Sequence, residues 1–207
     1  MCNCKLSPFA GLIKASLTEY MDTSKTPAES FPADGSRWFV MRDLSRNNAK
    51  LPAWEMLRAK HIRHFTPLVW QMVSCGGKRQ PRQVPYIQDL VFAYGTREQL
   101  DPLVERIRTF QYRYLRHTWR EPMTVPDRDM ERFILAVEST HSPRYYTPQE
   151  ITPDMRQRQV AIIGGPLDGY TGTLVTVRGS RRKRLLVEIP MLLAAAVEVE
   201  PEYIRLM

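Results

Sequence analysis

The segment from residue 160 to the C-terminus constrains the fold more than any other part of the chain. It begins Val-Ala-Ile-Ile-Gly-Gly-Pro-Leu-Asp-Gly-Tyr-Thr-Gly-Thr-Leu-Val, so two apolar runs flank a glycine-rich turn. Glycine adopts positive φ without steric cost, which allows such a turn to be tight. A basic break at 178–184 is followed by Leu-Leu-Val-Glu-Ile at 185–189 and by the alternating segment Val-Glu-Val-Glu at 197–200. This pattern predicts a small, strongly bent, all-β barrel of SH3-like type over residues 158–207.

The charge balance points to an anionic partner. The 207 residues carry a formal net charge of +8 and give a pI of about 9.6. Nucleic acid is the commonest polyanion in a cell, although solvated charge on a basic protein explains the same numbers. We expect no membrane span, because no apolar run approaches the roughly 18 residues that one requires. Three cysteines form no disulfide framework, which favours a reducing, cytoplasmic location.

Residues 37–138 alternate short apolar runs with helical patterns. Strands are expected at 38–41, 65–73, 90–94 and 112–115. Helices are expected after Asn47-Asn48, from Asp101-Pro102 and from Asp127, the last with apolar residues at i, i+3, i+4 and i+7. The order βαββαβα predicts an α+β fold, in which an antiparallel sheet carries flanking helices on one face.

Two further segments lack a sustained hydrophobic period. Residues 1–36 are mixed in composition, and we expect a flexible N-terminal tail. Residues 139–157 contain three prolines and little apolar content, so they are expected to be a semi-rigid linker between the two domains.

The whole arrangement resembles the NusG family of transcription elongation factors. The string Gly-Pro-Leu-Asp-Gly-Tyr-Thr-Gly-Thr-Leu-Val at 165–175 is similar to the KOW motif of transcription and ribosomal proteins. Upstream, the family's pattern is matched by Arg37-Trp-Phe-Val40, Phe65-Thr-Pro67, Leu90-Val-Phe92 and the helix entry Val125-Pro-Asp127. The resemblance covers residues 37–207 and is nearest to the UpxY-like antiterminators of capsular polysaccharide operons. It implies an N-terminal NGN domain, a C-terminal KOW domain and a monomer.

Two positions depart from the family pattern. Gln88-Asp89 stands where the family tends to have Pro-Gly, and Asp101-Pro-Leu103 stands where one specialised member carries a histidine-threonine contact to the polymerase. That contact is not carried over to this chain.

The resemblance implies a polymerase-binding surface on the N-terminal domain. Leu90, Phe92 and Tyr94 alternate along one strand and therefore share one face of the sheet. In the family, this strand helps to build an apolar patch that docks on the clamp helices of RNA polymerase. The alternative is that these residues face the core, since the residues between them, Val91 and Ala93, are apolar too.

A basic surface on the same domain suits DNA or RNA of the elongation complex. Lys78, Arg79 and Arg82 follow Gly76-Gly77 in a hairpin, and Arg106 and Arg108 lie further along the chain. Such side chains contact phosphates without reading sequence. Tyr112 and Tyr114 could stack on a base, but they suit packing in the sheet as well.

The C-terminal domain carries a possible partner loop. Met191, Leu192 and Leu193 form an apolar turn, which is unusual unless it is covered. In the family, the matching loop binds partners such as Rho or a ribosomal protein, whereas ordinary packing under the Ala194-Ala-Ala196 segment is the alternative.

Catalysis has little support in the sequence. The four histidines show no metal-ligand spacing, no phosphate-binding glycine loop occurs, and we expect no metal and no cofactor. The resulting hypothesis is a non-catalytic elongation and antitermination factor that suppresses pausing and termination. The alternatives are a ribosome- or RNA-binding KOW protein and a hydrolase that uses Cys75 with His64 as its base.

Overall fold

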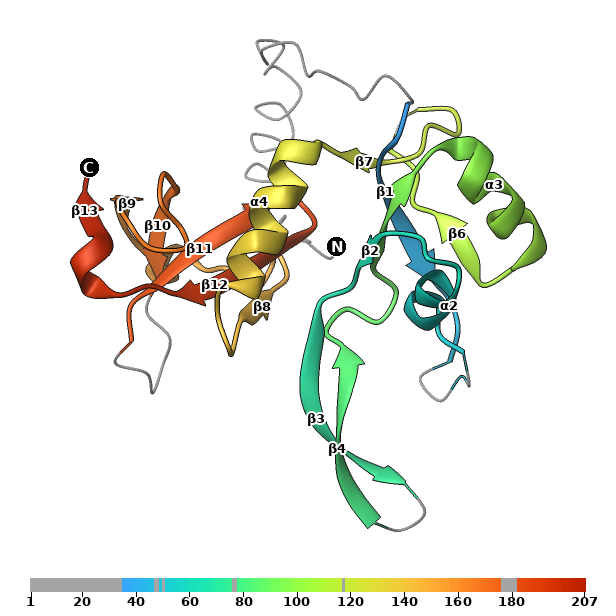
Figure 1. The fold of residues 1–207 in the computed structure, drawn as a ribbon, viewed down its shortest axis with the longest axis horizontal. Helices are drawn as coiled ribbons and strands as arrows, with labels where there is room; N and C mark the ends of the chain where they lie inside the picture. The colour runs from blue at the N-terminus through green and yellow to red at the C-terminus, as the bar shows by residue number, and fades with distance from the viewer. Residues whose placement is uncertain (1–34, 47–48, 50, 76–77, 117, 176–181) are drawn as a thin grey trace, which may run out of the picture. The chain divides into compact units, whose positions relative to one another are not determined.

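The computed structural model describes residues 35–207 apart from 47–48, 50, 76–77, 117 and 176–181 (Figure 1). The expected tail at 1–36 therefore lies almost wholly outside the described residues. By their contacts, residues 32–207 form one compact unit. The unit is mixed α+β, with antiparallel sheets and three α-helices in the described part, as the sequence predicts.

The N-terminal sheet is built around β1 (Arg37–Asp43), the first apolar run of the sequence. Its strand order is β2-β5-β1-β6, and β7 also pairs with β1. The other strands are β2 (His64–Phe65), β5 (Val91–Gly95), β6 (Phe110–Tyr112) and β7 (Thr124–Val125). All the pairings are antiparallel. A central strand with apolar residues at successive positions must be covered on both faces.

Helices cover both faces of this sheet, so the expectation of helices on one face is wrong. Phe39 and Met41 point to one face, where they pack with α2 (Ala53–Ala59) and α3 (Arg97–Arg106). Trp38 and Val40 point to the opposite face, which packs with α4 (Asp127–Glu138). The physical reason lies in β1 itself, because side chains of a strand alternate between faces and all four of these are buried.

Helix α3 begins earlier than the Asp101-Pro102 pair suggests. Thr96 accepts a hydrogen bond from the Gln99 backbone N–H at 3.3 Å, and the Gln99 side chain accepts one from the Thr96 N–H at 3.4 Å. This reciprocal capping box satisfies two free donors and fixes the start of the helix at Arg97. Pro102 consequently lies inside the helix.

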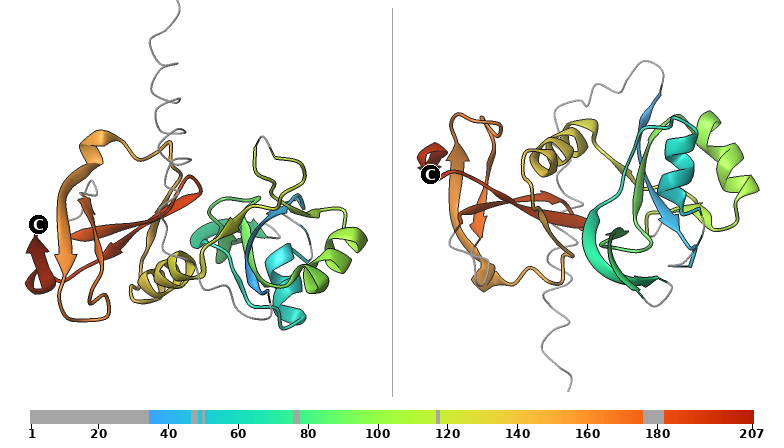
Figure 2. Two further views of the ribbon diagram at one scale, coloured as in Figure 1. Left: turned by 90° about the horizontal axis from the view of Figure 1, so that it is seen from above. Right: turned by 60° about the horizontal axis from the view of Figure 1, so that its bottom comes forward.

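The predicted strand at 65–73 is divided by Pro67. Its second part, β3 (Leu68–Cys75), pairs with β4 (Lys78–Pro85) as a separate two-stranded sheet. The register joins Leu68 to Pro85 and Cys75 to Lys78, so the basic residues of the predicted hairpin lie on its second strand. This β3–β4 hairpin projects away from α3 and from the five-stranded sheet (Figures 1 and 2).

The C-terminal strands form an open six-stranded sheet, so the expected closed barrel is wrong. Their order is β13-β9-β10-β11-β12-β8, without pairing between the two end strands in the described residues. The strands are β8 (Arg144–Tyr146), β9 (Arg156–Ile162), β10 (Thr171–Val175), β11 (Arg184–Ile189), β12 (Leu193–Glu198) and β13 (Ile204–Leu206). The physical reason is that β8 and β13 add to opposite edges of the sheet instead of to each other.

The glycine-rich turn between β9 and β10 has the conformation that its residues predict. Gly164, Gly165 and Gly169 have φ of 93°, 70° and 77°, which are values that side chains disfavour. The ring of Tyr203 also packs on this turn, and a Cβ added at Gly165 would lie 2.9 Å from the ring atom Cε2. Glycine is therefore required here both by backbone conformation and by the close approach of a second segment.

The segment at 139–157, expected to be a linker, contributes structure of its own. Its strand β8 pairs with β12, with Tyr145 opposite Ala195. The Tyr145 ring lies 5.8 Å from that of Tyr86, whose hydroxyl donates a hydrogen bond of 2.6 Å to Glu150. This hydrogen bond is the main cause that lowers the pKa of Glu150. Strand β8 was not predicted from the sequence, because it has only three residues, lies between prolines and shows no clear alternation of apolar residues.

Candidate nucleic-acid interface

The β3–β4 hairpin presents exposed arginines, as the sequence predicts. Arg79 and Arg82 are exposed on β4, and within the described residues neither forms an ion pair with a carboxylate. Lys78 begins β4, and its side chain lies outside the described part of the structure. Arg79 pairs in register with Ser74, and Arg82 with Gln71, so the two arginines point to opposite faces of the hairpin. Cations on both faces of a ribbon suit a phosphate backbone that passes along it.

Arg106 and Arg108 do not join this group. Arg106 ends α3 and Arg108 follows two residues later, and both are exposed. The hairpin projects away from α3 (Figure 1), and no extensive contact between described elements joins it to that helix. The basic residues predicted from the sequence therefore form two separate groups.

The predicted apolar patch at Leu90, Phe92 and Tyr94 is not an exposed surface. Leu90 and Phe92 are fully buried, and Tyr94 is half-buried. The three residues do share one face, but that face packs against α4 through Phe65 and Phe133, whose rings lie 5.8 Å apart. The physical reason is that both faces of β5 are covered, so neither set of alternating residues remains free. The polymerase-binding role of these residues stays a prediction.

Asp89 shows what replaces the Pro-Gly pair that the family tends to have before this strand. Its Oδ2 lies 3.4 Å from Arg42 and 3.3 Å from Arg113. One carboxylate therefore pairs with two arginines, one from β1 and one from the segment after β6, and offsets one of their two charges. Arg113 is consequently a poorer candidate for phosphate contact than the unpaired arginines.

The predicted partner loop is only partly accessible. Met191 is 57% exposed at the turn between β11 and β12, where it has a φ of 61°. Leu192 and Leu193 are buried in the core, as are the alanines that follow. The alternative of ordinary packing thus accounts for two of the three residues, while Met191 alone presents an apolar side chain.

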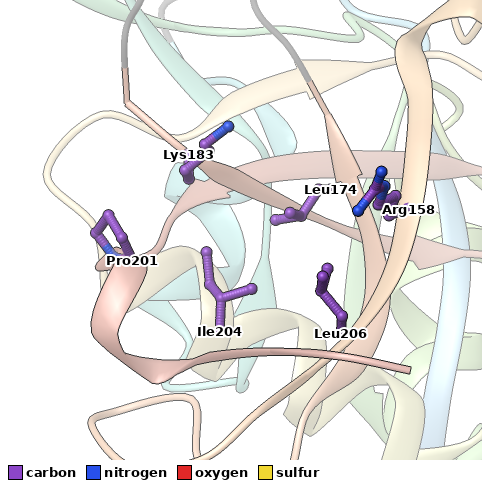
Figure 3. A pocket seen from close by; sticks show the side chains of 6 residues that line it. All are labelled: Arg158, Leu174, Lys183, Pro201, Ile204 and Leu206. Carbon is purple, nitrogen blue, oxygen red and sulfur yellow. The ribbon is translucent and has the colours of Figure 1, made fainter.

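A shallow depression lies elsewhere on the C-terminal sheet (Figure 3). It has a volume of about 660 Å³, and Arg158 and Lys183 supply its positive charge. Its apolar lining consists of Leu174, Pro201, Ile204 and Leu206. Such a lining suits a partner with an apolar group beside an anion, but Met191, Leu192 and Leu193 do not contribute to it.

Three of the exposed apolar side chains that the sequence analysis did not single out lie near exposed arginines. Trp70 and Met72 are 71% and 59% exposed on β3, and their positions in the register place them on one face of the hairpin. Trp119 is 86% exposed in the segment between β6 and β7. The sequence could have indicated Trp119, because it lies between Arg116 and Arg120 and because neighbouring aromatic and basic residues are typical of nucleic-acid-binding surfaces.

Among the described residues, no group of three or more histidine, cysteine or acidic side chains could hold a metal ion. His64 has its Nδ1 2.9 Å from the carbonyl oxygen of Ile62, and the side chain of Cys75 is outside the described part. Likewise, none of the helices in the described ranges is long and apolar enough to cross a membrane.

In comparisons with models of known protein families and with curated protein sequences, nothing matched this chain.

Proposed function

We propose that the chain is a NusG-type transcription elongation and antitermination factor, with an NGN-like N-terminal domain and a KOW-type C-terminal segment. The single observation that supports this most is the glycine-turned β9–β10 hairpin that carries the KOW-like string. Gly165 and Gly169 of that string, and Gly164 just before it, have left-handed φ values that suit a tight turn. The preceding α+β domain, with its basic hairpin, agrees with the order of elements that the family resemblance implies.

In this proposal, the two parts of the chain have different roles. The N-terminal domain binds the clamp helices of RNA polymerase, and the β3–β4 hairpin contacts nucleic acid of the elongation complex. The factor acts by binding the elongating state more tightly than the paused state, which shifts the population toward elongation. The C-terminal sheet recruits a further partner, such as Rho or the ribosome, through Met191 or the depression beside Arg158.

A single transcription experiment tests the proposal. The full chain is added to purified bacterial RNA polymerase on a template with a known pause site and terminator. We expect shorter pauses and more read-through, together with co-purification of polymerase with the tagged chain from extract. Co-purification of ribosomes instead, without any effect on pausing, would favour the alternative of a ribosome- or RNA-binding protein.

The basic hairpin gives a sharper test on the same complexes. Replacement of Lys78, Arg79 and Arg82 by alanine should leave the fold intact, because Arg79 and Arg82 are exposed and substitutions at exposed positions usually change stability by less than about 0.5 kcal/mol. Each lost phosphate contact should lower the slope of log affinity against log salt by about 0.9 on duplex DNA. Affinity is measured over a salt series, and Arg205→Ala, at an exposed arginine of β13, is the control with an unchanged slope. An unchanged slope in the triple variant would show that the hairpin does not contact phosphates.

A further inference from the structure

The segment between β6 and β7 forms a narrow, closed loop. Tyr114 and Pro122 form an isolated antiparallel bridge, and the Leu115 N–H donates to the Glu121 carbonyl at 3.0 Å. Near the tip, the Thr118 hydroxyl donates to the carbonyl of Leu115 at 3.2 Å. The loop projects from the sheet (Figure 2, left). These hydrogen bonds hold the two sides of the loop together.

The tip of this loop presents one aromatic ring with a cation against it. Trp119 is 86% exposed, and the guanidinium carbon of Arg120 lies 5.3 Å from the centre of its ring. Arg120 has a φ of 50°, a left-handed conformation that is disfavoured for a residue with a side chain. Such strain away from the core is often associated with a functional site. An arginine on one face of the indole leaves the rest of the ring accessible to a second planar group.

The charges around Trp119 are those of a phosphate-binding surface. Arg116 and Arg120 are exposed, and no ion pair joins either to a described carboxylate, including the neighbouring Glu121. Arg113 differs, because it already forms an ion pair with Asp89 at 3.3 Å. A flat, accessible indole between free guanidinium groups is the combination that proteins use for unpaired bases, since stacking holds the base while cations hold the backbone.

A protein partner fits this loop less well. Interfaces between proteins centre on a fully buried apolar cluster in which an anchoring aromatic is surrounded by other contacts. The described neighbours of Trp119 at the tip are Arg116, Thr118, Arg120 and Glu121, all of them polar and exposed. We therefore propose that the loop binds single-stranded nucleic acid, with an unpaired base stacked on Trp119 and phosphates held by Arg116 and Arg120. This goes beyond the proposed function, because it assigns a second nucleic-acid site separate from the β3–β4 hairpin.

The test measures binding of the full chain to labelled oligonucleotides of fifteen thymidines or fifteen uridines by fluorescence anisotropy. Trp119→Ala should weaken binding to at least one of them by about 5- to 100-fold, the range that removal of one stacking aromatic typically produces. Trp119→Phe should keep most of the affinity, because a phenyl ring still stacks. An oligomer of abasic sites should bind wild-type protein more weakly than thymidines do, and it should not distinguish Trp119→Ala from wild type.

A matched control is available in α2. Trp54 also has an arginine over its ring, with Arg58 at 5.0 Å, but the ring is half-buried on a helix. Trp54→Ala should leave oligonucleotide affinity unchanged in the folded fraction. Arg120→Lys should retain the dependence on salt, whereas Arg116→Ala should reduce it.

Several results would overturn the proposal. The first is that Trp119→Ala and wild type bind both oligonucleotides with equal affinity. The second is that wild type binds the abasic oligomer as tightly as the thymidine oligomer. The third is that Trp119→Ala loses polymerase binding but keeps its affinity for oligonucleotides. Polymerase co-purification is measured separately with the same proteins. If oligonucleotide binding depends on Trp119 but the chain does not bind polymerase, the proposed function is refuted and this inference stands. If the chain binds polymerase but oligonucleotide binding does not depend on Trp119, this inference is refuted and the proposed function stands.

Discussion

Replacement of Phe92 by alanine should destabilise the protein by about 3–5 kcal/mol, the range for a fully buried phenylalanine. The side chain is 0% exposed and packs 6.2 Å from the ring of Phe65, which in turn meets Phe133 of α4. Removal of the ring leaves a cavity between the sheet and α4 that these neighbours cannot fill without moving. Because small proteins have only about 5–15 kcal/mol of stability in total, the effect should dominate denaturant unfolding at equilibrium.

Met72→Ala is the matched control for this substitution. It also removes a large apolar side chain from a strand, but Met72 is 59% exposed on the β3–β4 hairpin. Its stability should change by no more than about 0.5 kcal/mol. If Phe92→Ala kept the wild-type stability and lost polymerase binding, Phe92 would contribute more to polymerase binding than to the stability of the core.

The sequence predicted most elements whose signal is local. The apolar run at β1, the periodic helix α4 and the glycine turn after β9 all have residue patterns that admit few alternatives. The same reasoning misplaced the start of α3. It gave weight to Asp101-Pro102, although Thr96 and Gln99 form a complete capping box five residues earlier.

Burial was harder to predict than secondary structure. A strand with alternating apolar residues on both faces leaves open which face is covered, and the structure covers both faces of β5. Leu90 and Phe92 of the predicted docking patch are buried for this reason. Strand β8 was missed because three residues give too little periodicity. A barrel was wrongly predicted for the C-terminal strands because the spacing of strands along the sequence does not determine which strand edges pair.

Arg184 is a further residue whose role the sequence did not reveal. It ends a run of basic residues, a pattern typical of a solvated surface, yet only 5% of its side chain is exposed. It donates a hydrogen bond of 2.5 Å to Oε1 of Glu198 and one of 3.1 Å to the carbonyl of Ser142. Arg182, which is largely exposed, pairs with the other carboxylate oxygen of Glu198. One carboxylate thus balances a buried arginine and orders the start of β11.

Replacement of Glu198 by glutamine should therefore cost about 3 kcal/mol, because removal of one partner leaves a buried charge without its counter-ion. Glutamine keeps the shape of the side chain, so the loss reports on charge. The control is Glu188→Gln, which removes the partner of Arg156 at 2.9 Å in a pair that is substantially exposed. Exposed pairs of this kind contribute about 0–1 kcal/mol. Unfolding in denaturant at pH 7 should separate the two variants clearly.

The pH dependence provides an independent check on Glu198. The hydrogen bond from Arg182, followed by the charges of Arg184 and Arg182, lowers the pKa of its carboxyl group below the ordinary value of about 4.3. The unfolded state then binds more protons than the folded state in this region, so stability falls as pH falls. The contribution is complete above the unfolded pKa and is lost as pH drops through the lowered folded pKa. The stability gap between wild type and Glu198→Gln should accordingly narrow below about pH 4. A gap that stayed constant down to acid pH would mean that the loss in the variant comes from altered packing, with no contribution from the charge on Glu198.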